Sequence, residues 1–194
     1  MNEFMYENYM QEITEKTHSY NEYILEHQNN VRKAWQEMQE KCEDEQFVYD
    51  DFWHGMINYA IKHHDMSKYD AEEFTQYRNF FYPCKYETVD KEAFNTAWKH
   101  HYRANCHHWE HWMNEDGTFR GDIDAEYSAT ATVNQVNNYI KIYTGYVEMI
   151  CDMTAMGYKF GDNALTYYEK NKHEIKILPN WVNMVERIMK KMAT

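Results

Sequence analysis

Proline and glycine are scarce in this chain, and their scarcity restricts the fold more than any other feature of the sequence. Only two prolines, Pro83 and Pro179, and six glycines occur in 194 residues, and residues 3–41 contain neither type. Because proline interrupts helices and glycine weakens them, long helices are favoured over a turn-rich β fold. The sequence therefore predicts an all-α, single-domain helical bundle over residues 1–194, long enough to bury a core.

Apolar residues recur at three- and four-residue spacing, as they do on the buried face of a helix. One such face runs from Tyr20 to Met38 and includes His27. Asp70 and Glu73 have the spacing of a capping box, and residues 118–126 read as an exposed loop. The motif-bearing core covers about residues 20–160, and helices within 162–192 are expected to pack on it. The predicted helices cover residues 3–41 (as one or two helices), 50–64, 70–82, 90–112, 129–156, 163–172 and a last segment from Pro179.

Composition excludes some classes of function. The net charge of −12 argues against binding to extended nucleic acid, which requires Lys- and Arg-rich surfaces. The four cysteines lie far apart without a CxxC pair, which indicates free thiols in a reducing compartment. The first residues are acidic, and no stretch approaches 18 uninterrupted apolar residues. We therefore expect a cytoplasmic protein that does not span a membrane; the oligomeric state is not indicated.

Adjacent His64 and Asp65 are the strongest candidate metal ligands. The imidazole is a borderline-soft ligand, while the carboxylate is hard and can bridge two ions. Lys68 follows three residues later, where its ammonium group would meet a phosphate bound by those ions. Alone, a His-Asp dipeptide is a weak signal, because it arises by chance in any histidine-rich protein.

A dense histidine cluster lies between residues 100 and 111. On a continuous helix over residues 90–112, His101 and His108 would share one stripe with Asn105, and His100 and His107 would share the adjacent stripe. Metal or phosphate binding is favoured here, with His101 and His108 as ligands and His100 or His107 as substitutes or as ligands of a third ion. The alternative is a solvated, weakly basic helix face.

His27 and Asp152 are less decisive on the residues alone. An inward-facing histidine such as His27 is more often a hydrogen-bonded core residue than a ligand. Asp152 lies beside the apolar seam of the helix predicted over residues 129–156, near its C-terminal end. A buried carboxylate there needs a cation or hydrogen bonds, whereas a surface aspartate needs neither.

The order His27, His64-Asp65, Asp152 resembles that of the HD-domain superfamily of metal-dependent phosphohydrolases. In that superfamily the four residues ligate a divalent ion inside a helical bundle. Residues 64–68 (HDMSK) also resemble the HDxGK form of its cyclic-dinucleotide phosphodiesterases, with Ser67 in place of glycine. Residues 107–117 are similar to their HHE…DG segment, in which extra histidines bind further metal ions. The GYP tripeptide of those enzymes is absent, since Thr118 follows Gly117.

The chain also resembles an uncharacterised family of small bacterial and phage proteins. The shared features are an HDxSK run that continues to EFxxY, within residues 64–77, and the segment HHYxxNxHHWE at residues 100–110. That family supplies no activity, so the expected chemistry rests on the HD pattern.

The HD resemblance implies a metal-dependent phosphohydrolase that acts on a small phosphorylated substrate, a nucleotide or another phosphate ester or phosphodiester. Asp65 would bridge two ions and Lys68 would neutralise charge on the phosphate, which Asn105 or Arg103 could also bind. One or two ions of Mn, Fe, Co, Ni or Zn suit a mixed His and carboxylate set. A di-iron oxygenase of the HD type and a non-catalytic binding protein stabilised by metal are the alternatives.

Overall fold

The computed structural model describes residues 3–120 and 131–194. Within these ranges the chain forms eight α-helices and no β-strand, which confirms the predicted all-α class. Short 3-10 segments lie at Met66–Tyr69, Trp109–Trp112 and Pro179–Trp181. The helices are α1 (Glu3–Lys41), α2 (Gln46–Tyr49), α3 (Asp51–Lys62), α4 (Phe74–Phe81), α5 (Lys91–Ala104), α6 (Val133–Phe160), α7 (Ala164–Asn171) and α8 (Val182–Met192).

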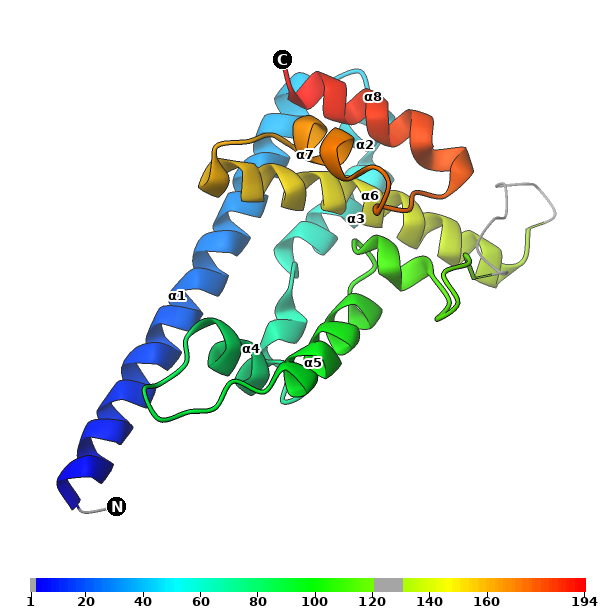
Figure 1. The fold of residues 1–194 in the computed structure, drawn as a ribbon. Coiled ribbons are helices and arrows are strands. Elements are labelled where there is room, and N and C mark those ends of the chain that lie inside the picture. The colour runs from blue at the N-terminus through cyan, green and yellow to red at the C-terminus, as the bar shows by residue number, and fades with distance from the viewer. Residues whose placement is uncertain (1–2, 121–130) are drawn as a thin grey trace.

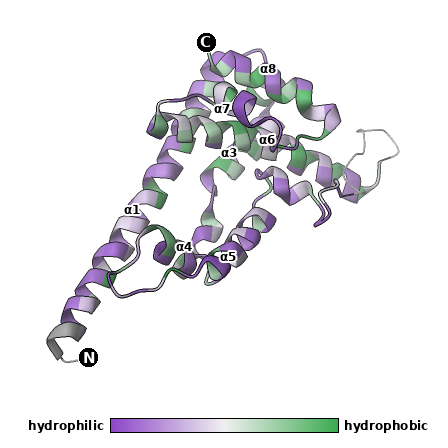
Figure 2. Cartoon of the chain, in the orientation of Figure 1, coloured by the Kyte–Doolittle hydropathy of each residue, from purple (hydrophilic) through white to green (hydrophobic). Residues whose placement is uncertain are grey.

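The main core lies where α6 crosses the C-terminal half of α1 (Figure 1). Helix α3 packs against the same stretch of α6, and α7 and α8 cover α6 from the other side. Hydrophobic residues gather in this upper body, whereas the N-terminal half of α1 is largely hydrophilic (Figure 2). Fully buried side chains of this core include Met38, Phe47, Ile57, Trp112, Tyr146, Ile150, Ile188 and Met189.

A smaller buried cluster joins α1 to α4 and α5. It contains Tyr20 and Ile24 from α1, Tyr77 from α4 and Ala97 from α5. Val31, two turns after Ile24, already belongs to the main core. The α1 segment between Ile24 and Val31, which includes His27, therefore lies between the two clusters.

Local sequence signals explain several helix ends. Asp50 accepts hydrogen bonds from the backbone N–H groups of Phe52 and Trp53 at the start of α3. Thr132 and Gln135 form a capping box that begins α6, and Gly161 ends it in the left-handed region with φ 73°. The predicted helix start at Ala129 and most of the predicted loop over 118–126 lie outside the described residues.

Two predictions about helices were wrong. The helix predicted over residues 90–112 ends at Ala104, because Asn105 adopts an extended conformation and a turn precedes the 3-10 segment. The helix predicted from Asp70 begins only at Phe74, and Glu73 makes no capping hydrogen bond. The side chain of Glu73 is instead completely buried against two histidines. Tertiary contacts override the local preference in both segments.

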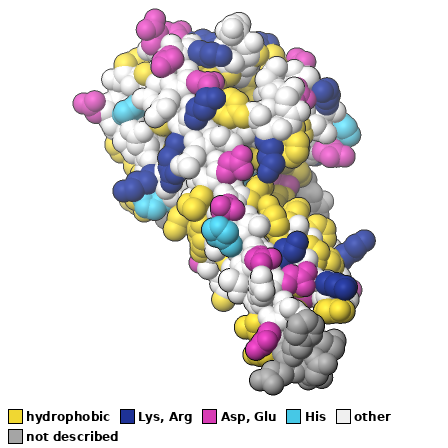
Figure 3. Space-filling model, turned by 90° about the vertical axis from the view of Figure 1, so that its left-hand side faces the viewer, with side chains coloured by type: hydrophobic (Ala, Val, Ile, Leu, Met, Phe, Trp, Pro, Cys, Tyr) yellow, Lys and Arg dark blue, Asp and Glu magenta, His cyan; other side chains and the backbone are white. Residues whose placement is uncertain are grey.

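Lys and Arg side chains are interspersed with Asp and Glu side chains over the face drawn in Figure 3. Among the described residues, no helix combines the length and the apolar composition needed to cross a bilayer.

Candidate metal centre

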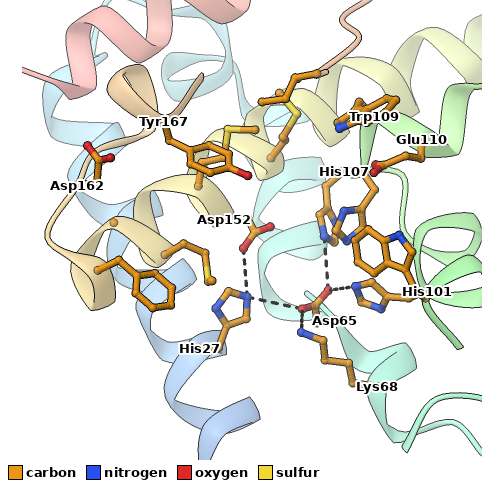
Figure 4. A pocket seen from close by; sticks show the side chains of 18 of the residues that line it. His27, Asp65, Lys68, His101, His107, Trp109, Glu110, Asp152, Asp162 and Tyr167 are labelled. Carbon is orange, nitrogen blue, oxygen red and sulfur yellow. Dashed lines mark ion pairs between the residues drawn. The ribbon is translucent and has the colours of Figure 1, made fainter. Parts of the chain in front are cut away.

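Three distant segments bring His27, His64, Asp65 and Asp152 together. Figure 4 shows His27, Asp65 and Asp152 of this cluster. Nε2 of His27 lies 3.1 Å from Nε2 of His64, 3.1 Å from Oδ1 of Asp152 and 3.6 Å from Oδ2 of Asp65. The side-chain amide of Gln28 on α1 donates a 2.9 Å hydrogen bond to the backbone carbonyl of His64, which ties α1 to the turn after α3. We call His27, His64 and Asp152 the first ligand group.

The backbone of Asp65 directs its carboxylate toward both α1 and α5. Asp65 is the one non-glycine residue with positive φ (56°) among the described residues. Aspartate tolerates this left-handed conformation better than most non-glycine residues, and residues held in such conformations cluster at functional sites. Oδ2 of Asp65 faces His27 and His64, while Oδ1 lies 3.3 Å from Nε2 of His101 and 3.4 Å from Nε2 of His107.

Asp65, His101, His107 and His108 form the second ligand group. One potential ligand atom from each residue lies within 4.8 Å of those of the other three. The early end of α5 makes this arrangement possible, because the turn after Asn105 brings both His107 and His108 back toward His101. Asn105 holds that turn: its side-chain amide donates to the backbone carbonyl of His101 (2.8 Å) and to Oγ of Ser67 (2.7 Å).

Two buried glutamates orient the imidazoles. Oε1 of Glu148 lies 2.8 Å from Nδ1 of His64 and 3.2 Å from Nδ1 of His107, so one oxygen contacts both ligand groups. Oε2 of Glu73 lies 2.8 Å from Nδ1 of His101. Histidine ligands of metal ions commonly donate Nδ1–H to a carboxylate in this way, which leaves the Nε2 lone pair for the metal.

Sequence reasoning missed both glutamates. Glu148 interrupts an otherwise apolar stretch of α6 and lies one turn before Asp152, on the same face of the helix. A glutamate at that position of an apolar helix indicates a buried polar site, so Glu148 could have been identified from the sequence. Glu73 was assigned to a helix cap, so its role at the site could not be predicted from its spacing.

The charges of the cluster are unbalanced. The cluster contains the four carboxyl side chains of Asp65, Glu73, Glu148 and Asp152 but only one ammonium group, that of Lys68, which lies 2.7 Å from Oδ2 of Asp65. Burial alone would raise the pKa of Glu148, but the charge of His107 and hydrogen bonds from His107 and His64 lower it to about 2. Glu148 is therefore ionised, and the two Nδ1 atoms that face it must donate.

The imidazoles respond to the same imbalance. Burial lowers the pKa of His107, but the nearby carboxylates of Glu148 and Asp65 raise it well above its ordinary value. Burial and the neighbouring imidazoles His107 and His101 hold the pKa of His108 well below its ordinary value. A cluster of buried carboxylates needs cations, and either protons or metal ions can supply them.

The residues present fit a metal ion. Oδ1 of Asp65, Nε2 of His107 and Nε2 of His108 are buried without a hydrogen-bond partner, although such atoms are normally satisfied. Neutral imidazole nitrogens and carboxylate oxygens are ligands for divalent transition metals. Two ligands that are each about 2.1 Å from one ion lie at most ~4.2 Å apart. The 3.1 Å between Nε2 of His27 and Nε2 of His64 agrees with that limit.

All members of the two ligand groups except His64 line the floor of a cavity of about 540 Å³. Lys68 lines this cavity, and the side chain of Asp152, 21% exposed, opens toward it. In Figure 4, Trp109 and Glu110 lie on one side of the cavity and Asp162 and Tyr167 on the other.

Three predicted site residues lie elsewhere. His100 belongs to neither ligand group, and its Nδ1 lies 2.7 Å from Oε1 of Glu73. Arg103 has a side chain that is 59% exposed and pairs with Glu115. Neither Arg103 nor Asn105 lines the cavity, so neither is positioned to bind a phosphate there. The other predicted ligands and Lys68 converge, and His107 joins them with more contacts than its predicted substitute role implied.

Residues 16–191 match a protein family described as "Family of unknown function (DUF5662)", and the chain therefore belongs to this family. No curated protein matches the chain, and no solved structure does.

Proposed function

We propose that this member of a family of unknown function is a metal-dependent phosphohydrolase of the HD type. Its substrate is a small phosphate ester that binds in the cavity above the two ligand groups. The order of His27, His64-Asp65 and Asp152 along the chain is the HD pattern, and the convergence of these residues supports the assignment.

One observation carries the proposal: the carboxylate of Asp65 is shared between two sets of imidazoles. Each of its oxygens faces two Nε2 atoms, at 3.3 to 3.6 Å. Glu148 and Glu73 hold the opposite nitrogens of His64, His107 and His101. An arrangement with a shared carboxylate and oriented imidazoles suits two neighbouring divalent ions.

The ions would supply Lewis-acid activation of a water molecule and neutralisation of phosphate charge. The first ligand group and Asp65 would hold one ion, and the second ligand group would hold the other. Lys68 would then neutralise charge on the non-bridging phosphate oxygens from the cavity wall. Hydrolysis forms a bond from the water oxygen to phosphorus and breaks the bond from phosphorus to the leaving oxygen, which takes up a proton.

The deciding experiment is elemental metal analysis of the wild type beside Asp65→Asn, together with a screen of phosphate monoesters and diesters. Asparagine tolerates the left-handed backbone of position 65 but removes the shared charge. We expect the wild type to retain transition metal and to hydrolyse an ester, and Asp65→Asn to lose both. Asp51→Asn, an exposed aspartate on α3, is the matched control and should behave as the wild type.

The same samples test the alternatives. Iron loading with mixed-valence spectra and no ester turnover would support a di-iron oxygenase instead. Bound metal that affects only folding stability would support a non-catalytic binding protein. A wild type that takes up no transition metal under any loading condition would contradict all three functions.

A further inference from the structure

The walls of the cavity differ sharply from its floor. Above the ligand groups, α6 contributes a row of apolar side chains, and Tyr167 on α7 continues it. Trp98 from α5 and Trp109 lie on the opposite wall. The apolar members of the lining are Met149, Met153, Met156, Phe160, Ile175, Trp98 and Trp109, with Tyr23, Tyr77 and Tyr167 presenting rings.

Lysine and arginine contribute only one side chain to the described lining of the cavity. Lys68 is the only lysine or arginine among the described residues that line the cavity, and it already pairs with Asp65. Sites for polyphosphates normally supply several cationic or backbone donors along the phosphate chain. The other acidic residues of the upper walls are Glu110 and Asp162, and neither carboxyl group would attract a second anionic group.

Glu110 adds a polar feature to the apolar wall. Its Oε2 atom is buried and has no hydrogen-bond partner, although the residue lines the cavity. A hydroxyl or amino group on a bound molecule could donate to this oxygen. Asp162, in contrast, is already paired with Lys170 at 3.0 Å.

We propose that the substrate carries a single phosphoryl group on an uncharged, ring-containing and largely apolar body. The phosphoryl group lies on the floor beside Lys68, and the body lies between the α6 wall and the two tryptophans. Nucleoside triphosphates and cyclic dinucleotides are poor substrates, because each carries further phosphates for which the walls offer no cation. This inference rests on the proposed function and narrows its substrate class. The cavity volume is that of ordinary small-molecule sites, which bury most of a ligand against apolar walls.

The test compares 1-naphthyl phosphate, methyl phosphate and ATP as substrates of the Mn²⁺-loaded protein. We expect kcat/KM for naphthyl phosphate to exceed that for ATP at least 100-fold, and the KM for naphthyl phosphate to lie at least 10-fold below that for methyl phosphate. Equal or better turnover of ATP would overturn the inference. Equal KM values for methyl and naphthyl phosphate would also overturn it, since the walls would then contribute nothing to binding.

Tyr167→Lys tests the role of wall charge directly. Tyr167 is 48% exposed at the cavity wall, so lysine is compatible with folding there. We expect the ratio of kcat/KM for ATP to that for naphthyl phosphate to rise about 10-fold, and an unchanged ratio would count against the inference. Tyr59→Lys on α3 is the control, because Tyr59 is 65% exposed and does not line the cavity.

A binding measurement separates this inference from the proposed function. Calorimetry with 1-naphthylphosphonate and a non-hydrolysable ATP analogue needs no turnover. If the phosphonate binds at least 10-fold more tightly than the ATP analogue, the inference is supported, even if no ester is hydrolysed. Absence of hydrolysis would refute only the proposed hydrolase function. Tighter binding of the ATP analogue, or binding of neither probe, refutes the inference.

Discussion

Nδ1 of His64 donates a hydrogen bond to Oε1 of Glu148 across 2.8 Å in the buried centre of the fold. Because Glu148 is a carboxylate and can only accept, the proton of His64 is fixed on Nδ1. Nε2 of His64, which carries the lone pair in the neutral imidazole, lies 3.1 Å from Nε2 of His27. The same glutamate oxygen lies 3.2 Å from Nδ1 of His107, so one residue orients an imidazole in each ligand group.

Glu148→Gln should weaken both metal sites. The amide is a poorer acceptor and can turn an N–H group toward the imidazoles, which would favour the wrong tautomer of His64 and His107. Loss of such a partner typically costs about 10- to 100-fold in metal affinity. We expect losses of this size for both ions, measured by calorimetric titration with Mn²⁺ or Zn²⁺.

Glu73→Gln is the matched comparison, because Glu73 contacts His101 of the second ligand group and no residue of the first. Glu73→Gln should lower the affinity of the second ligand group for its ion and leave that of the first ligand group at the wild-type value. Equal effects of the two variants on both ions would show that Glu148 has no special role in linking the ligand groups.

Lys68→Met should separate metal binding from turnover. The ammonium group contacts Asp65 but is not a metal ligand, and methionine fills a similar volume in its buried position. If Lys68 neutralises the phosphate, kcat should fall about 100- to 1000-fold, while metal content measured by elemental analysis stays at the wild-type level. Lys62→Met, an exposed lysine in the last turn of α3, should change neither quantity. Loss of metal from Lys68→Met would instead make the lysine a structural partner of Asp65.

Parts of the centre could be predicted from the sequence because they depend on order and helix periodicity. His27 lies on the apolar face of α1, and His64 continues the apolar face of α3, so both were expected to point inward. Their convergence with Asp152 could not follow from periodicity, since it depends on how α1 and α6 cross. It was expected only through the resemblance to the HD superfamily.

The histidine cluster shows why the rest could not be predicted. A continuous helix pairs His101 with His108 and leaves His107 on the next stripe, but the helix ends at Ala104. The end is imposed by packing: the backbone of Cys106 lies against Gly145 of α6, where no side chain intervenes. This contact joins residues 39 positions apart, and no local pattern encodes it. It turns His107 inward, while His100 remains outside against Glu73.

The bidentate ion pair between Arg78 and Glu87 should give stability that depends on pH. Hydrogen bonds from the Arg78 guanidinium lower the pKa of Glu87 from 4.5 to about 2. Because the pKa of Glu87 is lower in the folded protein than in the unfolded chain, its ionised form stabilises the fold at pH values above the unfolded-state pKa. This stabilisation is lost as the pH falls from about 4.5 toward 2. We expect Glu87→Gln to lower the free energy of unfolding by about 2 kcal/mol at pH 7, as for other hydrogen bonds to charged groups.

Urea denaturation of both proteins at pH 7, 4 and 3 measures this effect. The difference in free energy of unfolding between the wild type and Glu87→Gln should shrink as the pH falls. Because the two proteins share all other carboxylates, the contributions of those groups cancel in this difference. A difference that stays constant over this range would mean that Glu87 is not held as a carboxylate by Arg78.

Gly145→Ala should disturb the second ligand group through the backbone. A Cβ atom at position 145 would lie 2.5 Å from the carbonyl oxygen of Cys106, which also accepts a hydrogen bond from the indole of Trp112. The backbone must shift, at a cost of about 1–3 kcal/mol typical of overpacked cores. Because His107 follows Cys106 directly, we expect metal affinity to fall at the second ligand group more than at the first.

Gly55→Ala is the control for this substitution, since nothing lies within 4 Å of a Cβ atom at position 55 in α3. Alanine in a helix interior should raise the free energy of unfolding by about 0.5–1 kcal/mol and leave metal binding unchanged. Chemical denaturation and metal titration of both variants measure the two effects. Wild-type stability in Gly145→Ala would contradict the close approach of α6 to Cys106, and with it the proposed reason why α5 ends where it does.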